Sequence, residues 1–431
     1  MMKYKLRFLV LSTFFVMFIS GCTSSQPQGE KIVIWHWMND RKASLEELAL
    51  RYMEETGVPI EFKLFSPPDI YSQKVIAAAR AGRLPDIFGI LGEKKTLASF
   101  IRAGYILDLT SYMAQDKETW KKSFYSQALE VVSFDKNNIY GVEPGVWGVP
   151  IDITVMEFLY NRDLFKKAGL DPEKAPVTFD EFIDYAKTIK KTCGVDGFVC
   201  GWGEGWLLNA LATEWAINIM GERKFLATIN GDVSYTDPQW IEVFSLFKKM
   251  KDSGILASDI TTMINKEAED AFSKGKAGFS FNGSWSINVY SQLSSGLDYA
   301  FFSLPKVSSA YPVKIWGGAG SSFMVNANSP AKEKAVAFLK WLTEKNQQEF
   351  LAKETNNLPS IKNCQKNLPK LLAGLTKDLG ILTHPNIWPY NENSRVLEIM
   401  NKGLQQVVMG IKTPEEIAKE IQDVKERVSK R

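Results

Sequence analysis

The fold class is decided by one stretch near the start of the chain, KIVIWHWMNDRKASLEELALRYMEETGVPIEFKLF at residues 31–65. Its apolar residues predict a short strand at 31–35, then an amphipathic helix, then a second strand at 59–65. The pattern continues with another helix over 69–82 and another strand over 86–90. Because strands that alternate with helices pair in parallel and are covered on both faces, the sequence predicts an α/β protein.

Polar and aromatic residues cluster where two of these predicted strands end. The first strand ends at Trp35, and Trp37, Asp40 and Arg41 follow in its loop, while the loop after the third strand contains Glu93. In sheets of this kind, ligands bind at the carboxyl ends of the strands. We therefore expect part of a binding site in these two loops.

Residues 1–21 have the composition of an export signal. The first seven residues carry three basic side chains, and the apolar stretch at 8–19 is too short to span a bilayer comfortably. Small residues and Cys22 follow, in the order of a bacterial lipoprotein signal. A buried N-terminal helix is disfavoured, because the polar residues 22–30 lack a core-forming pattern and read as a flexible tether. We expect Cys22 to be lipidated and the protein to be extracytoplasmic, anchored to the cell membrane.

The charge of the chain excludes a nucleic-acid partner. The chain has 431 residues and a formal net charge of +3, for which the basic residues of segment 1–21 account entirely. Nucleic-acid binders need a net positive surface to displace counterions from phosphates. The length predicts two or three domains, and no second apolar run of membrane-spanning length follows residue 22.

The cysteines and histidines indicate neither a disulfide scaffold nor a metal site. Cys193 and Cys200 flank a glycine-containing segment, where an exported location permits a disulfide and two free thiols fit equally well. The spacing matches no zinc pattern, and the two histidines, His36 and His384, lie far apart in the sequence. We expect no cofactor and no metal.

Familiar enzyme motifs are missing from the sequence. It contains no G-x-S-x-G nucleophile elbow, no P-loop, no H-E-x-x-H and no G-x-G-x-x-G. A glycosidase needs only two carboxylates, so this one enzyme class stays open.

Tryptophans stand out at loop and turn positions, often beside glycine. They are Trp35, Trp37, Trp147, Trp202, Trp206, Trp285, Trp316 and Trp388. Several have polar neighbours, such as Glu204 beside Trp206 and Asn282 beside Trp285. Taken singly, each of them is better explained as a core residue. As a group they predict a carbohydrate cleft, because an indole stacks on the apolar face of a pyranose while polar side chains bind its hydroxyl groups.

Four segments, in this order, resemble the family 1 extracellular solute-binding proteins of ABC importers, the maltodextrin-binding group. These segments are 71–88, 147–181, 272–285 and 317–342. The resemblance extends from about residue 30 to the C-terminus. It implies a periplasmic-binding-protein-like fold, in which two α/β lobes are joined by crossing strands and close as a hinge on a ligand cleft.

The resemblance also implies lobe boundaries and ligand contacts. We expect lobe 1 to comprise 31–152 plus 303–326, and lobe 2 to comprise 153–302 plus 327–431. The contacts of the family fall on Asp40, Arg41, Glu93, Thr154, Glu204, Trp206 and Trp285. Asn282, Trp316 and Trp388 are further candidates, together with Trp35 and Trp37. Thr154 replaces a glutamate found in maltodextrin binders, and the loop around Glu93 is longer, so maltose itself is not carried over.

The function that the resemblance implies is transport. The protein would bind a mono- or oligosaccharide as a monomer and deliver it to the transmembrane subunits of an ABC permease, with no enzymatic activity of its own. Three alternatives stay open. They are an extracytoplasmic glycoside-active enzyme that uses Glu204 and a second acid, a sensor module that presents ligand to a receptor, and a binder of peptide, polyamine or metal chelate.

Overall fold

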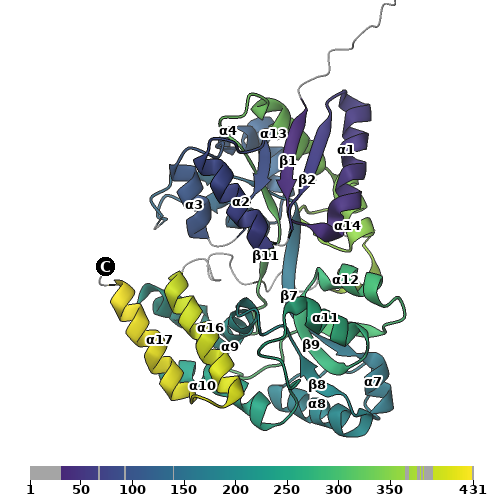
Figure 1. The fold of residues 1–431 in the computed structure, drawn as a ribbon, viewed down its shortest axis with the longest axis vertical. Coiled ribbons are helices and arrows are strands. Elements are labelled where there is room, and N and C mark those ends of the chain that lie inside the picture. Colours follow the sequence, from purple (N-terminus) through teal and green to yellow (C-terminus); the bar gives the residue numbers. More distant parts are fainter. Residues whose placement is uncertain are drawn as a thin grey trace, which may run out of the picture.

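Ten consecutive buried residues form β7, Asp152–Asn161, the longest strand of the described chain. The computed structural model describes residues 31–66, 68–91, 94–138, 140–364, 368–375, 379, 382 and 392–429. In Figure 1, β7 runs from the upper lobe into the lower one, and β11 (Gly317–Ala319) pairs with it. The chain therefore forms two lobes joined by crossing strands, which confirms the predicted architecture.

Several predicted features lie outside the described residues. These are the signal segment 1–21, Cys22, the tether 22–30, and the candidate site residues Glu93 and Trp388. Within the described ranges, none of the helices combines the length and the hydropathy that crossing a bilayer requires.

The sheet of the first lobe has the strand order β2-β1-β3-β12-β6. Its strands are β1 Ile32–His36, β2 Ile60–Leu64, β3 Ile87–Gly89, β6 Val149–Pro150 and β12 Ser322–Val325. β1 pairs in parallel with β2 and β3, as predicted, whereas β12 is antiparallel to both β3 and β6. The antiparallel strand β12 returns from the second lobe and pairs with β3 on one side and β6 on the other.

Helices cover both faces of this sheet. They are η1 Asn39–Arg41, α1 Lys42–Thr56, α2 Pro68–Arg80, α3 Lys94–Arg102, α4 Thr110–Met113, α5 Gln115–Ser123, α6 Ser126–Val131, α13 Lys332–Leu342 and α14 Lys345–Thr355, with a small hairpin of β4 Ser133–Phe134 and β5 Gly145–Val146. Ile32 and Ile34 point to one face and pack against α1 and α13. Phe88 and Tyr71 are buried on the other face.

The second lobe is built on a mixed sheet with the order β10-β7-β9-β8, and β11 and β13 also pair with β7. Its other strands are β8 Asp196–Val199, β9 Ala277–Gly283, β10 Tyr299–Phe302 and β13 Leu358–Pro359. β8 and β9 are parallel, whereas β7 runs antiparallel to β9 and β10. The carboxyl ends of β8 and β9 therefore lie at the same edge of the sheet, where ligand loops are expected.

An aromatic core fills this lobe. Its helices are α7 Arg162–Lys167, α8 Phe179–Cys193, α9 Trp206–Asn230, α10 Pro238–Asp252, α11 Asn265–Ser273, α12 Ser286–Leu293, α15 Lys370–Leu375, α16 Ser394–Met409 and α17 Pro414–Ser429. Phe158 on β7 contacts the rings of Phe182 and Phe198. Burying one such side chain contributes roughly 2 kcal/mol. Trp202, one of the tryptophans at a predicted loop, is fully buried here beside Phe198, so it is a core residue.

The lobe boundaries differ from those expected after residue 302. Phe338 and Leu339 of α13 and Leu351 of α14 belong to the first-lobe core, although 327–431 was assigned to lobe 2. Conversely, Leu304 is buried in the second-lobe core, although 303–326 was assigned to lobe 1. A helix pattern identifies an apolar face but not the sheet that this face packs against.

The suggested disulfide between Cys193 and Cys200 is absent, and both thiols are free. Cys193 ends α8, whereas Cys200 follows β8 and donates to the carbonyl of Phe281 over 3.2 Å. The intervening residues form a strand instead of a turn, and four strand residues span roughly 13 Å. A disulfide needs Cα atoms within about 7 Å of each other.

Candidate ligand-binding site

Two tryptophans stand together at the ligand edge of the second-lobe sheet. Trp206 is the first residue of α9, and Trp285 follows β9 directly before α12. Their ring centroids lie 5.9 Å apart with the planes tilted by 47°. Both side chains are partly buried, packed against the second-lobe core. The pair therefore forms an aromatic wall at the position where α/β sheets bind ligands.

Each indole is held by its own carboxylate. The Nε1–H of Trp206 donates to Glu204 Oε2 over 3.1 Å, and the Nε1–H of Trp285 donates to Glu269 Oε1 over 3.1 Å. Hydrogen bonds to a charged acceptor are stronger than neutral ones and fix the orientation of the donor. Since both N–H groups are already bonded, the rings have only their faces and edges to offer a ligand.

Two asparagines join these carboxylates into one network. Asn265 donates its side-chain amide to Glu269 Oε1 over 2.9 Å and its backbone N–H to Glu204 Oε1 over 2.9 Å. Asn282 also donates to Glu269 Oε1, over 3.0 Å. We call this group the indole–carboxylate cluster. It consists of Glu204, Trp206, Asn265, Glu269, Asn282 and Trp285.

Glu269 is the central acceptor of the cluster and is only 6% exposed. Burial raises the pKa of Glu269, three hydrogen bonds from Asn282, Trp285 and Asn265 lower it in part, and the neighbouring charge of Glu204 raises it further. An oxygen that accepts three N–H groups is the acceptor expected of an ionised carboxylate. The hydrogen bonds therefore keep a negative charge at a site that water reaches poorly.

Glycines at two strand ends make room for two of the predicted tryptophans. A Cβ placed on Gly283, the last residue of β9, would overlap the six-membered ring of Trp285. In the first lobe, a Cβ on Gly89, the last residue of β3, would overlap the ring of Trp37. In both lobes an indole therefore lies flat against the end of a strand, which any other residue at the glycine position would prevent.

The first-lobe tryptophans form a separate aromatic group. Trp35 lies edge-on to Phe65 at 5.0 Å, and the Nζ of Lys74 is 5.1 Å from the Trp35 ring. Trp37 lies 5.1 Å from the ring of Tyr71. Trp35 and Trp37 are half-buried on the first-lobe core. The predicted stacking residues are thus divided between the two lobes.

Arg41 is buried at the junction of the lobes. Only 7% of the residue is exposed, and its guanidinium lies 2.5 Å from Asp152 at the start of β7. It also donates to Asn357 over 2.8 Å and to Ser321 over 3.4 Å, which lie at the two other points where the chain crosses between the lobes, from α14 to β13 and from β11 to β12. Arg41 therefore joins the crossing segments to one another, and the hydrogen bonds of its guanidinium are made to residues of the protein itself.

Asp40 forms a direct contact between the lobes. Its backbone carbonyl accepts a hydrogen bond of 3.4 Å from the side-chain amide of Asn288 on α12. Because α12 begins immediately after Trp285, the first-lobe loop and the indole–carboxylate cluster lie on the same side of the junction.

Thr154 and Trp316 belong to the crossing strands. Thr154 is buried on β7 opposite Gly318 of β11. Trp316 directly precedes β11, and its backbone N–H donates to the buried carboxylate of Glu214 over 2.8 Å. Burial raises the pKa of Glu214 well above its usual value. These residues hold the crossing in place, whichever ligand the cluster binds.

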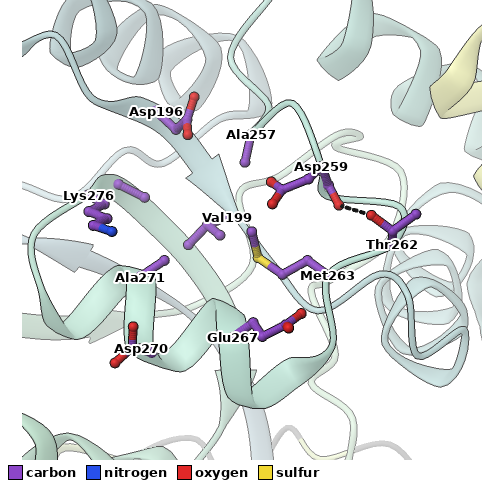
Figure 2. A pocket seen from close by; sticks show the side chains of 11 residues that line it. Asp196, Val199, Ala257, Asp259, Thr262, Met263, Glu267, Asp270, Ala271 and Lys276 are labelled. Carbon is purple, nitrogen blue, oxygen red and sulfur yellow. Dashed lines mark hydrogen bonds between the residues drawn. The ribbon is translucent and has the colours of Figure 1, made fainter.

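A separate hollow of about 600 Å³ opens on the second lobe, between β8 and α11 (Figure 2). Its lining includes Asp196, Asp259, Glu267, Asp270 and Lys276 and contains no predicted site residue. Across the part of the chain that the structure describes, no three histidine, cysteine or acidic side chains gather as metal ligands.

The structure therefore brings together four of the predicted residues and adds two others. Glu204, Trp206, Asn282 and Trp285 meet in the cluster, whereas Asn265 and Glu269 were missed. No sequence signal marked Glu269, because its burial on α11 comes from packing against β9. A carboxylate on the apolar face of a helix needs a partner.

Two lobes, three crossings and a polar aromatic site at the junction define the class of the extracytoplasmic ligand-binding proteins that close as a hinge. The comparison with known families agrees with this assignment. Residues 36–349 match the family described as bacterial extracellular solute-binding protein, and the chain belongs to this family. This confirms the resemblance drawn from the sequence.

Individual relatives are distant but cover most of the chain. The multiple sugar-binding protein of Streptococcus mutans is 24% identical over 82% of this chain and 81% of its own length. The galactooligosaccharide-binding protein of Bacillus subtilis is 21% identical over 80% of this chain and 76% of its own length. The solved structure of maltose-bound T. maritima MalE3 superposes with a TM-score of 0.76 at 19% identity, covering 92% of this chain and 99% of that one. This structural likeness supports the fold.

Proposed function

We propose that this protein binds a mono- or oligosaccharide outside the cytoplasm and delivers it to the transmembrane subunits of an ABC permease. The observation that carries the proposal is the pair Trp206 and Trp285, whose N–H groups are bonded to carboxylates and whose rings lie together and are only partly buried. The apolar face of a pyranose fits such rings, and its hydroxyl groups need fixed polar partners. The names of the relatives, a multiple sugar-binding protein and a galactooligosaccharide-binding protein, point to the same class of ligand.

Hinge closure supplies the mechanism. The second-lobe tryptophans and the first-lobe pair Trp35 and Trp37 belong to different rigid cores. A saccharide that contacts both groups binds the closed form more tightly and raises its population by this difference in affinity. The Asp40–Asn288 hydrogen bond already joins the lobes on that side. The permease then recognises the closed form, and ATP is hydrolysed by separate subunits.

The N-terminal segment supports a lipid anchor at Cys22, and we propose that the protein works as a monomer tethered to the membrane. An anchored binder needs no oligomeric interface, because its local concentration at the permease is set by the tether.

The rival proposal, a glycoside-active enzyme, would require Glu204 as a reacting group. Both oxygens of Glu204 accept hydrogen bonds, from Trp206 and from the backbone of Asn265, which supports a binding role. The sensor alternative predicts the same ligand chemistry and differs only in the membrane partner, so genes for two permease subunits beside this one would argue against it.

A melting-temperature screen against maltotriose, xylotriose, chitotriose, stachyose and tagatose tests the proposal. A ligand present at 100 times its Kd stabilises a protein by about 2.7 kcal/mol. We expect at least one saccharide to raise the Tm by several degrees without being hydrolysed, as checked by chromatography of the incubated sugar. Hydrolysis would favour the enzyme, and a Tm that no saccharide changes would contradict sugar binding.

A further inference from the structure

The charge of the indole–carboxylate cluster bears on the charge of the ligand that it can bind. Among the residues that the structure describes, the hydrogen-bond partners of Glu204 and Glu269 are uncharged N–H groups, from Trp206, Asn265, Asn282 and Trp285. Neither carboxylate forms an ion pair within the described ranges. Within the described residues, the two negative charges therefore have no cationic partner.

Two buried carboxylates elsewhere in the molecule have cationic partners. Asp152 pairs with Arg41, and Glu392 accepts from Lys425 over 2.7 Å. This comparison matters because a buried charge is costly unless it is paired or strongly hydrogen-bonded. In the indole–carboxylate cluster, neutral N–H donors stabilise the carboxylates instead of cations. The negative charge therefore acts on a ligand that is bound against the two indoles.

We infer that Glu204 and Glu269 make this site selective for uncharged saccharides over phosphorylated sugars, uronates and aldonates, and that Glu269 acts as the positioning residue of Trp285. The inference rests on the proposed function, because it concerns the ligand of the same cluster. An anionic group bound beside the rings would lie close to two like charges, and repulsion is strongest at Glu269, which is only 6% exposed and therefore poorly screened by solvent. A hydroxyl group in the same place can donate to a carboxylate instead.

Among the described residues of the first lobe, Lys74 is a cation that lies close to the aromatic group. Its Nζ lies over both Trp35 and Phe65, 5.1 and 4.4 Å from the ring centroids, so a cation–π interaction already holds it. An anionic ligand would have to draw Lys74 away from these rings while still facing Glu204 and Glu269 from the other lobe. This arrangement therefore favours an uncharged ligand as well.

Paired ligands that differ only in charge test the selectivity. We would titrate the protein calorimetrically, at constant ionic strength and pH 7.5, with maltotriose against maltotrionate, galactobiose against digalacturonate, and glucose against glucose 6-phosphate. We expect the neutral member of each pair that binds to bind at least tenfold more tightly than the anionic member. In the double variant Glu204→Gln/Glu269→Gln, this ratio should fall at least tenfold.

Asp270→Asn serves as the matched control, because Asp270 is the next residue on α11 and forms only a helical ion pair with Lys274 at the surface. This variant should bind the neutral and the anionic member of each pair with the same affinity ratio as the wild-type protein. An anionic member that binds the wild-type protein as tightly as its neutral partner would overturn the selectivity and leave the transport proposal standing. If no member of any pair bound, the proposed function would fall and the selectivity with it.

The positioning role is tested separately, in the unliganded protein. With ¹⁵N-labelled tryptophan, and with Trp285→Phe to assign its resonance, we expect the Trp285 indole N–H to exchange with solvent at least tenfold more slowly in the wild type than in Glu269→Ala. Glu269→Gln, which keeps an acceptor oxygen, should restore part of this protection. Equal exchange rates in the wild type and Glu269→Ala would overturn the positioning role.

Discussion

The indole N–H of Trp285 donates to the carboxylate of Glu269 over 3.1 Å, although the two residues lie 16 positions apart on different elements. The bond joins α11 to the end of β9, and the same carboxylate oxygen accepts from Asn282 and Asn265. The orientation of the ring is therefore set by packing of a helix on a strand, before any ligand arrives. Such preorganisation lowers the entropic cost of binding.

Replacing Trp285 by alanine should weaken saccharide binding about 10- to 100-fold, because aromatic stacking and its buried area are worth about 1–3 kcal/mol. The Tm of the unliganded protein should change little, since this side chain is only partly buried. Calorimetric titration with the best ligand of the screen, and a melting curve without ligand, check both parts. Trp147→Ala, a half-buried first-lobe tryptophan outside the cluster, is the control. A large loss of unliganded stability in Trp285→Ala would show that Trp285 is a core residue.

Gly283→Ala should reduce saccharide affinity although the added group is a single methyl. The Cβ would occupy the space of the Trp285 ring, so the indole has to rotate away from Glu269. We expect roughly a tenfold loss of affinity and a change in the near-ultraviolet circular dichroism of the protein. Gly296→Ala is the matched control, because a Cβ there meets nothing within 4 Å. Equal affinities in the two variants would contradict the proposed role of the glycine.

Arg41→Met should destabilise the protein by about 3–5 kcal/mol, because it leaves the buried carboxylate of Asp152 without its cation. Replacing both residues, in Arg41→Met/Asp152→Leu, should cost less than the two single changes together. Urea unfolding of the wild type, both single variants and the double variant measures this coupling. Additive losses would mean that the pair does not stabilise the junction, and Arg41 would then return to the candidates for ligand contact.

Acid should destabilise the protein partly through His36. This side chain is fully buried, and burial is the main cause that lowers the pKa of His36 to about 4, with the charge of Arg41 second. A lowered pKa in the folded state means that the stabilisation is complete above the unfolded value of 6.5 and is lost as the pH falls toward 4. The difference amounts to about 3 kcal/mol. Between pH 7.5 and pH 4, the free energy of unfolding should therefore fall by about 3 kcal/mol less in His36→Phe than in the wild type. Urea unfolding at the two pH values measures this difference. If the free energy of unfolding fell equally with pH in the two proteins, His36 would not be a cause of the acid destabilisation.

Local patterns predicted many elements correctly. The helix predicted over 69–82 forms as α2 and the strand predicted over 86–90 contains β3, and in the same way a capping box at Thr178 and Glu181 begins α8. These features depend on neighbours within a few residues, which the sequence displays directly. The thiols of Cys193 and Cys200 show the limit of such patterns, because a glycine between them did not prevent β8 from forming.

The candidate site was predicted in part for the same reason. Glu204 and Trp206 lie two positions apart in the sequence, and Asn282 and Trp285 lie three apart, so each pair could be recognised as a polar and aromatic unit. Glu269 lies on a helix whose exposed face is also acidic, and only its packing against β9 distinguishes it from Glu267 and Asp270. The family resemblance placed Arg41 among the ligand contacts, and the sequence could not show its pairing with Asp152, which comes close only when the crossing strand is formed.

The sequence by itself determined the α/β class, the strands and helices near the N-terminus, the family, and the residue types that could meet a sugar. These depend on periodicity, capping and short motifs, which are local properties of the chain. Only the tertiary structure decided which lobe α13 and α14 join, which carboxylate holds which indole, and that Arg41 is buried at the junction. Each of these results comes from contacts between segments distant in sequence, and their geometry exists only after the lobes have packed and the crossing strands have paired.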